Sequence, residues 1–98
     1  MKVRILSPAE REFVEAVDYY NRQRPGLGFE FASEVQSALT RIALAPNAWP
    51  RVSPRMRRCK VRRFPYGILF QVRADEVVVS VIMHLSRDPQ KWSERAEQ

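Results

Sequence analysis

The sequence is poor in the residues that build disulfides and zinc sites. Its 98 residues include one cysteine, Cys59, and one histidine, His84. A single cysteine cannot form a disulfide within the chain, and one cysteine with one histidine is too few for a zinc cluster. We therefore expect no metal site and no cofactor. The basic segment around Cys59 would lower the pKa of an exposed thiol, but we interpret Cys59 as a small buried hydrophobic residue.

Long apolar stretches are also missing. No run approaches the roughly 18 apolar residues of a transmembrane helix, and residues 1–9 lack the apolar core of a secretory signal. We therefore expect a cytoplasmic protein with no membrane partner. The length suits one domain over residues 1–98, and no repeat, low-complexity tract or linker divides the sequence.

Positive charge, in contrast, is in excess. The chain has 17 Lys and Arg against 11 Asp and Glu, a net charge of +6. Basic domains of this size often bind an anion, such as nucleic acid, an acidic partner or a membrane surface. Six of the positive charges fall within residues 55–63. Either this segment binds an anion, or it is a solvated strand that uses charge to discourage edge pairing.

The first half of the chain predicts a strand followed by two helices. Residues 2–6 alternate polar and apolar side chains, which indicates a short strand. Ser7 can cap a first helix that runs to about Arg22. A Pro-Gly break at residues 25–26 ends that helix, and apolar spacing then predicts a second helix over residues 27–44. The short connection favours an antiparallel helical hairpin.

The second half predicts three strands after a proline-rich loop over residues 45–54, from which Trp49 should fold back onto the core. The strands are expected over residues 55–64, 67–73 and 77–85, with connections short enough for antiparallel hairpins. The last is almost continuously apolar and therefore central. The order β-α-α-β-β-β predicts an α+β domain in which the helical hairpin packs on one face of a small, mainly antiparallel sheet.

Side chains alternate across each strand, so the residues of each face can be predicted. One set should form the core under the helices: Cys59, Val61, Ile68, Phe70, Val72, Val77, Val79 and Val81. The opposite set should form an open basic face: Arg58, Lys60, Arg62, Leu69, Gln71, Arg73, Ser80, Ile82 and His84. We expect this face to bind nucleic acid or a partner protein.

Two segments carry the most specific signal. Residues 61–70 read Val-Arg-Arg-Phe-Pro-Tyr-Gly-Ile-Leu-Phe, and residues 84–92 read His-Leu-Ser-Arg-Asp-Pro-Gln-Lys-Trp. Together they resemble the ParE-like branch of the RelE/ParE toxin superfamily, and the resemblance covers essentially the whole chain. It implies the same fold and a growth-inhibiting toxin of a type II toxin–antitoxin module. Its partner would be a cognate antitoxin that wraps the toxin with a helix and an extended segment.

The resemblance leaves the target open between DNA gyrase and the ribosome with its mRNA. ParE-like members poison gyrase by binding it, and in that case the basic strand and the tail serve docking without catalysis. The docking candidates are Arg58, Lys60, Arg62, Arg73, Arg87 and Trp92. The detailed motifs favour this branch.

The alternative is ribosome-dependent, metal-independent mRNA cleavage, as in RelE-like members. Such cleavage needs a base, an acid and cations that stabilise the phosphorane-like charge. The catalytic candidates are Lys60, Arg62, His84 and Arg87. RelE-like members carry an aromatic hydroxyl where this chain has Trp92 as the nearest candidate, so the sequence departs from the nuclease pattern there.

Overall fold

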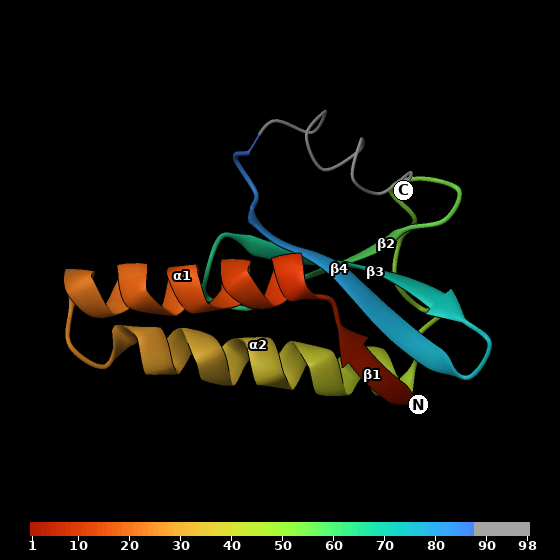
Figure 1. Cartoon of the computed structure of the whole chain (residues 1–98), viewed down its shortest axis with the longest axis horizontal. Helices are drawn as coiled ribbons and strands as arrows, with labels where there is room; N and C mark the ends of the chain where they lie inside the picture. The colour runs from red at the N-terminus through yellow and green to blue at the C-terminus, as the bar shows by residue number, and fades with distance from the viewer. Residues whose placement is uncertain (88–98) are drawn as a thin grey trace.

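The computed structural model describes residues 1–87, which form four strands and two helices (Figure 1). In chain order these are β1 (Lys2–Ile5), α1 (Ser7–Gln23), α2 (Leu27–Leu44), β2 (Arg57–Lys60), β3 (Tyr66–Arg73) and β4 (Glu76–His84). The predicted α+β order is confirmed. Within the described part of the chain, no helix is long and apolar enough to cross a membrane.

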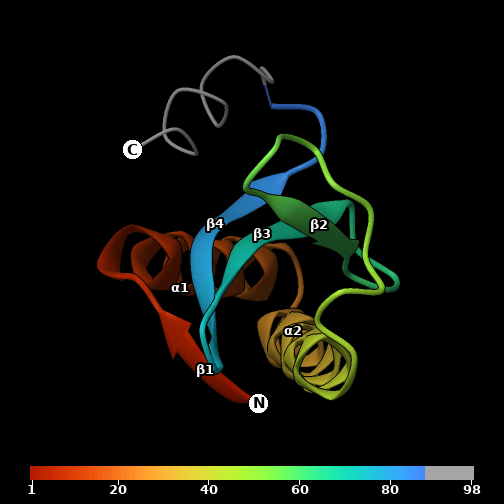
Figure 2. The same ribbon diagram turned by 90° about the vertical axis from the view of Figure 1, so that its right-hand side faces the viewer.

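The four strands form one sheet in the order β1-β4-β3-β2. β1 runs parallel to β4, whereas the β2–β3 and β3–β4 pairs are antiparallel. The two helices lie side by side on one face of the sheet (Figure 2). The predicted arrangement, a helical hairpin on a mainly antiparallel sheet, is therefore confirmed, and β4 is central as its apolar sequence indicated.

The helices meet closely because a glycine lies at their contact. A Cβ atom at Gly28 would overlap the carbonyl oxygen of Val17 and the side chain of Asn21. The Gly28 N–H donates a 2.7 Å hydrogen bond to Asn21 Oδ1. α2 has the predicted bounds. The predicted cap of α1 was wrong, because Ser7 is already helical, Leu6 is the N-cap and no side chain caps the helix.

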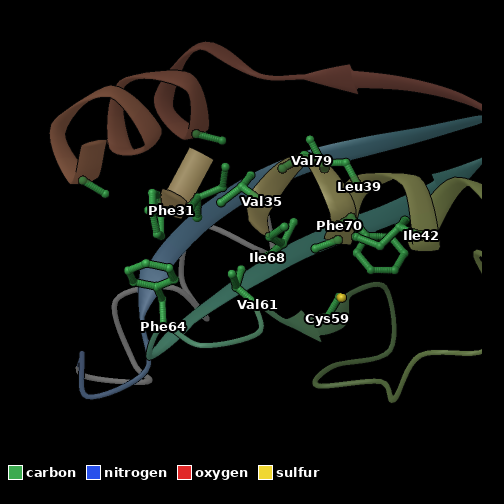
Figure 3. Close-up of a cluster of buried hydrophobic side chains, with 14 of the residues drawn as sticks. Phe31, Val35, Leu39, Ile42, Cys59, Val61, Phe64, Ile68, Phe70 and Val79 are labelled. Carbon is green, nitrogen blue, oxygen red and sulfur yellow. The ribbon is translucent and has the colours of Figure 1, made fainter. Parts of the chain in front are cut away.

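The main core lies between the helices and the sheet (Figure 3). Its fully buried members include Phe31, Ile42, Ile68 and Phe70. Trp49 packs against this core, as predicted. A fully buried large side chain contributes about 1.5–3 kcal/mol through removal of apolar surface from water, so these few residues fix the relative positions of helices and sheet.

An extra residue in β4 changes which side chains face the helices. Leu69 pairs with Val81 but Phe70 pairs with Val79, so Ser80 forms a β-bulge. A bulge reverses the alternation beyond it. Ile82 therefore joins the helix-side core, whereas Val81 packs on the far side of the sheet with Met56, Leu69 and Met83. The prediction was wrong for Val81 and for Ile82, and it was also wrong for His84.

Strand β2 is shorter than predicted and ends at Lys60. Arg62 lies in the connection to β3 instead of on the sheet face where it was predicted. The next residue, Arg63, has a φ of 71°, a left-handed conformation that no regular strand contains. The chain therefore turns immediately after β2, and the predicted basic strand of ten residues is a four-residue strand with a basic connection on either side.

Candidate functional site

The positive charge is concentrated in the second half of the described chain. Residues 1–50 carry six Lys and Arg and six Asp and Glu, whereas residues 51–87 carry nine Lys and Arg and only two acidic residues. The excess lies on β2, on the connections that flank it and at the ends of β3 and β4. This half is therefore the part of residues 1–87 in which an anion meets the larger excess of positive charge.

The far face of the sheet is not the open basic face that the sequence predicted. Its centre is apolar and buried, with Leu69, Val81 and Met83 packed together. The cations lie at its β2 edge. Arg58 is opposite Leu69 and Lys60 is opposite Gly67, so both side chains project from the far face. Neither the Arg58 guanidinium nor the Lys60 ammonium makes a hydrogen bond or ion pair with any of residues 1–87, so both charged groups are available to a partner.

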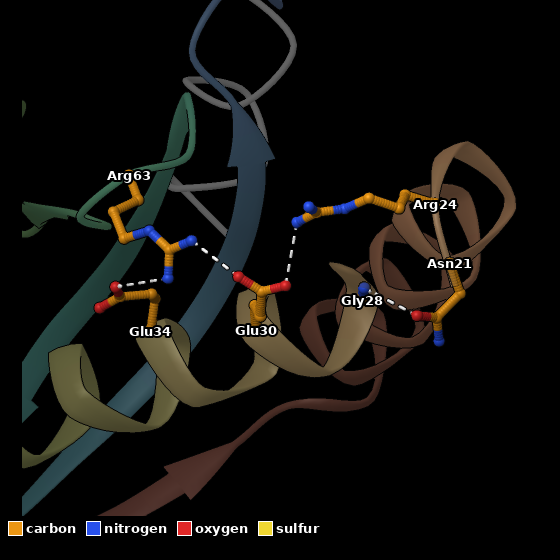
Figure 4. A network of polar contacts seen from close by, with 6 residues as sticks. All are labelled: Asn21, Arg24, Gly28, Glu30, Glu34 and Arg63. Atoms are coloured by element: carbon orange, nitrogen blue, oxygen red, sulfur yellow. Dashed lines mark hydrogen bonds and ion pairs between the residues drawn. The ribbon is translucent and has the colours of Figure 1, made fainter. Parts of the chain in front are cut away.

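Two other cations of the same segment, Arg57 and Arg63, make contacts within the protein. Arg57 Nη1 donates a 2.7 Å hydrogen bond to the Trp49 carbonyl oxygen. Arg63 forms ion pairs with Glu30 at 2.8 Å and with Glu34 at 3.6 Å (Figure 4). The hydrogen bond from Arg63 lowers the pKa of Glu30. Arg63 thus ties the β2–β3 connection to α2, which is a structural role.

His84 lies on the helix side of the sheet because of the bulge at Ser80. It pairs with Tyr66 across the strands, and the two rings meet edge to face with centroids 5.4 Å apart. Its Nδ1 accepts a 3.1 Å hydrogen bond from the Ser86 backbone N–H, and Ser86 Oγ lies 2.7 Å from the same atom. The neutral ring that fits these contacts carries its proton on Nε2.

Arg87 lies beside His84 and is held by α1. Its guanidinium pairs with Glu12 at 3.2 Å, and its backbone N–H donates to the His84 carbonyl oxygen. Burial raises the pKa of Tyr66, and the charge of Arg87 opposes that rise. His84, Arg87, Tyr66 and Glu12 therefore form one cluster, which we call the tail cluster, where β4 ends against α1.

Comparison with known proteins places this architecture in a family. The sequence model described as the ParE toxin of the type II toxin–antitoxin system parDE matches residues 3–89. The chain belongs to the ParE toxin family. A solved structure titled "Chromosomal ParDE TA system from P. aeruginosa" superposes with a TM-score of 0.77 over 86% of this chain and 95% of that one. The two sequences are 17% identical, so this likeness shows the fold. No curated protein matches the chain significantly.

The structure separates the predicted site residues of this ParE-family toxin into three groups. His84 and Arg87 lie together in the tail cluster. Arg58 and Lys60 project from the far face, and Arg62 follows them on the connection. Arg73 ends β3 seven residues after Tyr66, about 23 Å along the strand at the usual rise per residue. Trp92 lies outside the described residues.

Sequence reasoning missed Glu12 as a member of the tail cluster. Its Oε1 accepts a hydrogen bond from the Ile82 backbone N–H at 3.1 Å. One signal was available: the strand predicted over residues 2–6 is much shorter than the strand predicted over residues 77–85. The rest of that β4 edge needs an acceptor from another element, because buried backbone N–H groups are nearly always paired.

Cys59 has the structural role that the sequence indicated. It is fully buried in the main core, and burial raises the pKa of its thiol. A buried thiol with a raised pKa is a poor nucleophile because little of it is thiolate at neutral pH. In the ParE-family fold it serves as a small core residue under α2.

Proposed function

We propose that this ParE-family protein is the growth-inhibiting toxin of a type II toxin–antitoxin module and that it poisons DNA gyrase by binding it. The observation that carries this choice is the position of Lys60 relative to His84. Lys60 pairs with Gly67, and His84 pairs with Tyr66. The two residues are therefore near one end of the sheet, but their side chains leave it on opposite faces.

This separation counts against the nuclease alternative. Acid–base cleavage of a phosphodiester requires the base, the acid and the stabilising cations within hydrogen-bond reach of one reacting group. Here β3 separates the strands of Lys60 and His84, which puts their backbones about 10 Å apart at the usual strand spacing. In addition, His84 Nδ1 is occupied by Ser86, and Arg87 is paired with Glu12.

Docking onto a partner protein accounts better for the cations that have no ion-pair partner within residues 1–87. Arg58, Lys60 and Arg62 form a short basic strip along the β2 edge, and none is neutralised by a neighbour among residues 1–87. Charges placed at the rim of an interface accelerate encounter and select the partner more than they add affinity. A strip of this kind suits an acidic surface of a large DNA-bound enzyme such as gyrase.

The helix side offers a separate surface for an antitoxin. Two adjoining hollows of about 450 and 400 Å³ share Val3, Ile5, Gln36 and Leu39 as lining residues. They form a mainly apolar groove between α2 and β1, and β1 is the edge of the sheet. Such a groove suits an amphipathic helix, and a free strand edge suits an extended segment. The structural neighbour comes from a ParDE toxin–antitoxin system, which supports an antitoxin partner here.

The test adds purified toxin separately to a gyrase supercoiling reaction and to ribosomes programmed with mRNA. The wild type and a His84→Ala variant are both expected to inhibit gyrase and to leave the mRNA intact. An Arg58→Gln/Lys60→Gln variant should inhibit gyrase several-fold less well. Arg11→Gln/Arg22→Gln removes the same charge from exposed sites on α1 and should behave as wild type.

Ribosome-dependent mRNA cuts that disappear in His84→Ala, with gyrase unaffected, would overturn the proposal in favour of the nuclease. Failure to inhibit growth when the toxin is expressed without its antitoxin would count against both activities. If Arg58→Gln/Lys60→Gln and Arg11→Gln/Arg22→Gln lose gyrase inhibition to the same extent, the total charge of the protein, and not the basic strip, governs that inhibition.

A further inference from the structure

The connection between α2 and β2 forms a small hairpin that extends the β2 edge. Arg51 and Arg57 form an isolated antiparallel bridge. Next to it, the Val52 N–H donates to the Met56 carbonyl oxygen at 2.9 Å, and the Arg58 N–H donates to the Pro50 carbonyl oxygen at 3.0 Å. In Figure 2 this yellow-green segment runs along the β2 side of the sheet, across from α1.

The hairpin is well anchored. Ser53 Oγ accepts a 3.1 Å hydrogen bond from the Met56 N–H across the turn. The Met56 side chain is fully buried on the far side of the sheet with Leu69. These contacts fix the backbone from which Arg51, Arg55 and Arg57 project. A fixed backbone lowers the conformational entropy lost when such side chains bind a ligand.

The three arginines line a polar cavity of about 270 Å³, which we call the arginine pocket. Its other lining residues are Asn47, Pro54, Gln71 and Val72. No acidic residue contributes to this lining. Arg51 and Arg55 make no side-chain hydrogen bond or ion pair with residues 1–87, and Arg57 donates through Nη1 to the Trp49 carbonyl oxygen. Most guanidinium donors around the pocket are therefore unused.

Gln71 adds a further donor to the pocket. Its Oε1 accepts a 2.8 Å hydrogen bond from Nε of Arg73, a cation next to the lining residues, and its amide nitrogen makes no hydrogen bond within residues 1–87. Gln71 is the one polar residue in the buried set of the described chain, and it lines the pocket. Several like charges around one cavity repel each other, and an anion in the cavity relieves that repulsion.

We propose that the arginine pocket binds a phosphate of a nucleic-acid backbone. Arginine presents a planar fork of donors that matches phosphate oxygens, and it is the residue most used for this recognition. Arg58 and Lys60 follow Arg57 on β2 and project from the opposite face of the sheet. Residues 51–87 as a whole carry nine Lys and Arg against two acidic residues, and this excess suits a polymer with one negative charge at every unit, as in a phosphodiester chain.

This site is distinct from the residues considered for cleavage. It lies beside Gln71 and Val72 near the end of β3, whereas the tail cluster lies at its beginning beside Tyr66. The inference goes beyond the proposed function and does not depend on gyrase being the target, because binding can be measured with nucleic acid alone. A toxin that inhibits gyrase without binding nucleic acid would refute this inference and leave the proposed function intact.

The experiment measures fluorescence anisotropy of a short labelled DNA duplex, a single-stranded RNA and a polyglutamate peptide, each titrated with full-length toxin over a range of salt. The pocket variant is Arg51→Gln/Arg55→Gln, whose side chains are exposed and make no hydrogen bond or ion pair within residues 1–87. The matched control is again Arg11→Gln/Arg22→Gln. Thermal melting checks that both variants fold as the wild type does.

The pocket variant should bind nucleic acid at least about tenfold more weakly near 0.1 M salt, with the slope of log K against log salt reduced by about 1.8 for two lost phosphate contacts on a duplex. The control should change little. If the toxin binds the DNA duplex more tightly than the RNA, the pocket binds DNA phosphate, and the reverse order of affinity indicates RNA. The inference is overturned by absent binding, by equal loss in the two variants, or by polyglutamate binding that is equally sensitive to the pocket variant.

Discussion

The carboxylate of Glu12 accepts a hydrogen bond from the backbone N–H of Ile82 at 3.1 Å, across 70 positions of the sequence. β1 pairs with β4 only as far as Val79. Beyond that point no strand of residues 1–87 covers this edge of β4, and α1 supplies the acceptor instead. The second carboxylate oxygen pairs with Arg87 at 3.2 Å. One side chain therefore joins α1, the central strand and the segment that follows it.

This relationship predicts the effect of truncating Glu12. Ile82 is buried, so Glu12→Ala leaves its N–H without the acceptor and should lower the free energy of unfolding by about 1–3 kcal/mol. Glu12→Gln retains an acceptor and loses only the charge, so it should cost clearly less. Urea denaturation measures both, with the exposed Glu15→Ala on the same helix as the control. Equal losses for Ala and Gln would show that the negative charge of Glu12, and not the hydrogen bond from the Ile82 N–H, matters for stability.

The helix contact at Gly28 makes a second prediction. Because an added Cβ would overlap the Val17 carbonyl oxygen, Gly28→Ala must push α1 and α2 apart and should cost about 2 kcal/mol or more. Gly26→Ala is the informative comparison. Gly26 has a φ of 90° and open space around it, so its cost should be only the left-handed backbone penalty of about 1 kcal/mol. Thermal unfolding ranks the two, and the reverse order would contradict the packing argument.

The ion pairs of Glu30 predict a pH dependence. Arg63 and Arg24 lower the pKa of Glu30 from its ordinary value of 4.5. A carboxyl whose pKa is lowered by folding stabilises the protein above its ordinary pKa, and this stabilisation is lost as the pH falls through the lowered value. The stability difference between wild type and Glu30→Gln should therefore shrink from neutral pH to about pH 3. Denaturation at both pH values measures it, and an unchanged difference would contradict the role of the ion pairs.

The fold was largely predictable because its elements carry local signals. The Pro-Gly break after Arg24 and the apolar spacing of α2 place the helices, and the apolar run of β4 places the central strand. The face of the sheet that each side chain occupies was less predictable. The extra residue Ser80 cannot be recognised within an almost continuous apolar run, yet it moves every later side chain of β4 to the other face of the sheet. This is why His84 was expected beside Lys60 and lies on the other face.

The candidate site was predictable in composition but not in arrangement. The density of cations in residues 55–63 is visible in the sequence, but their partners are not. Arg63 is neutralised by Glu30 and Glu34, which lie about 30 positions earlier in the chain. Such pairings depend on tertiary contacts, so sequence reasoning could not separate the structural cations from the free ones.

The groove between α2 and β1 makes the last prediction. Leu44 lines it and is 81% exposed, so Leu44→Glu should leave the fold and the toxicity unchanged. If the antitoxin covers this groove, a buried unpaired carboxylate would cost it several kcal/mol. Co-expression with the proposed cognate antitoxin should then no longer rescue growth. Phe29→Glu is the matched control, because Phe29 is also exposed on α2 but at its opposite end. Rescue of both variants would show that the antitoxin neutralises the toxin from another surface, and loss of rescue in both would show that the effect is not specific to the groove.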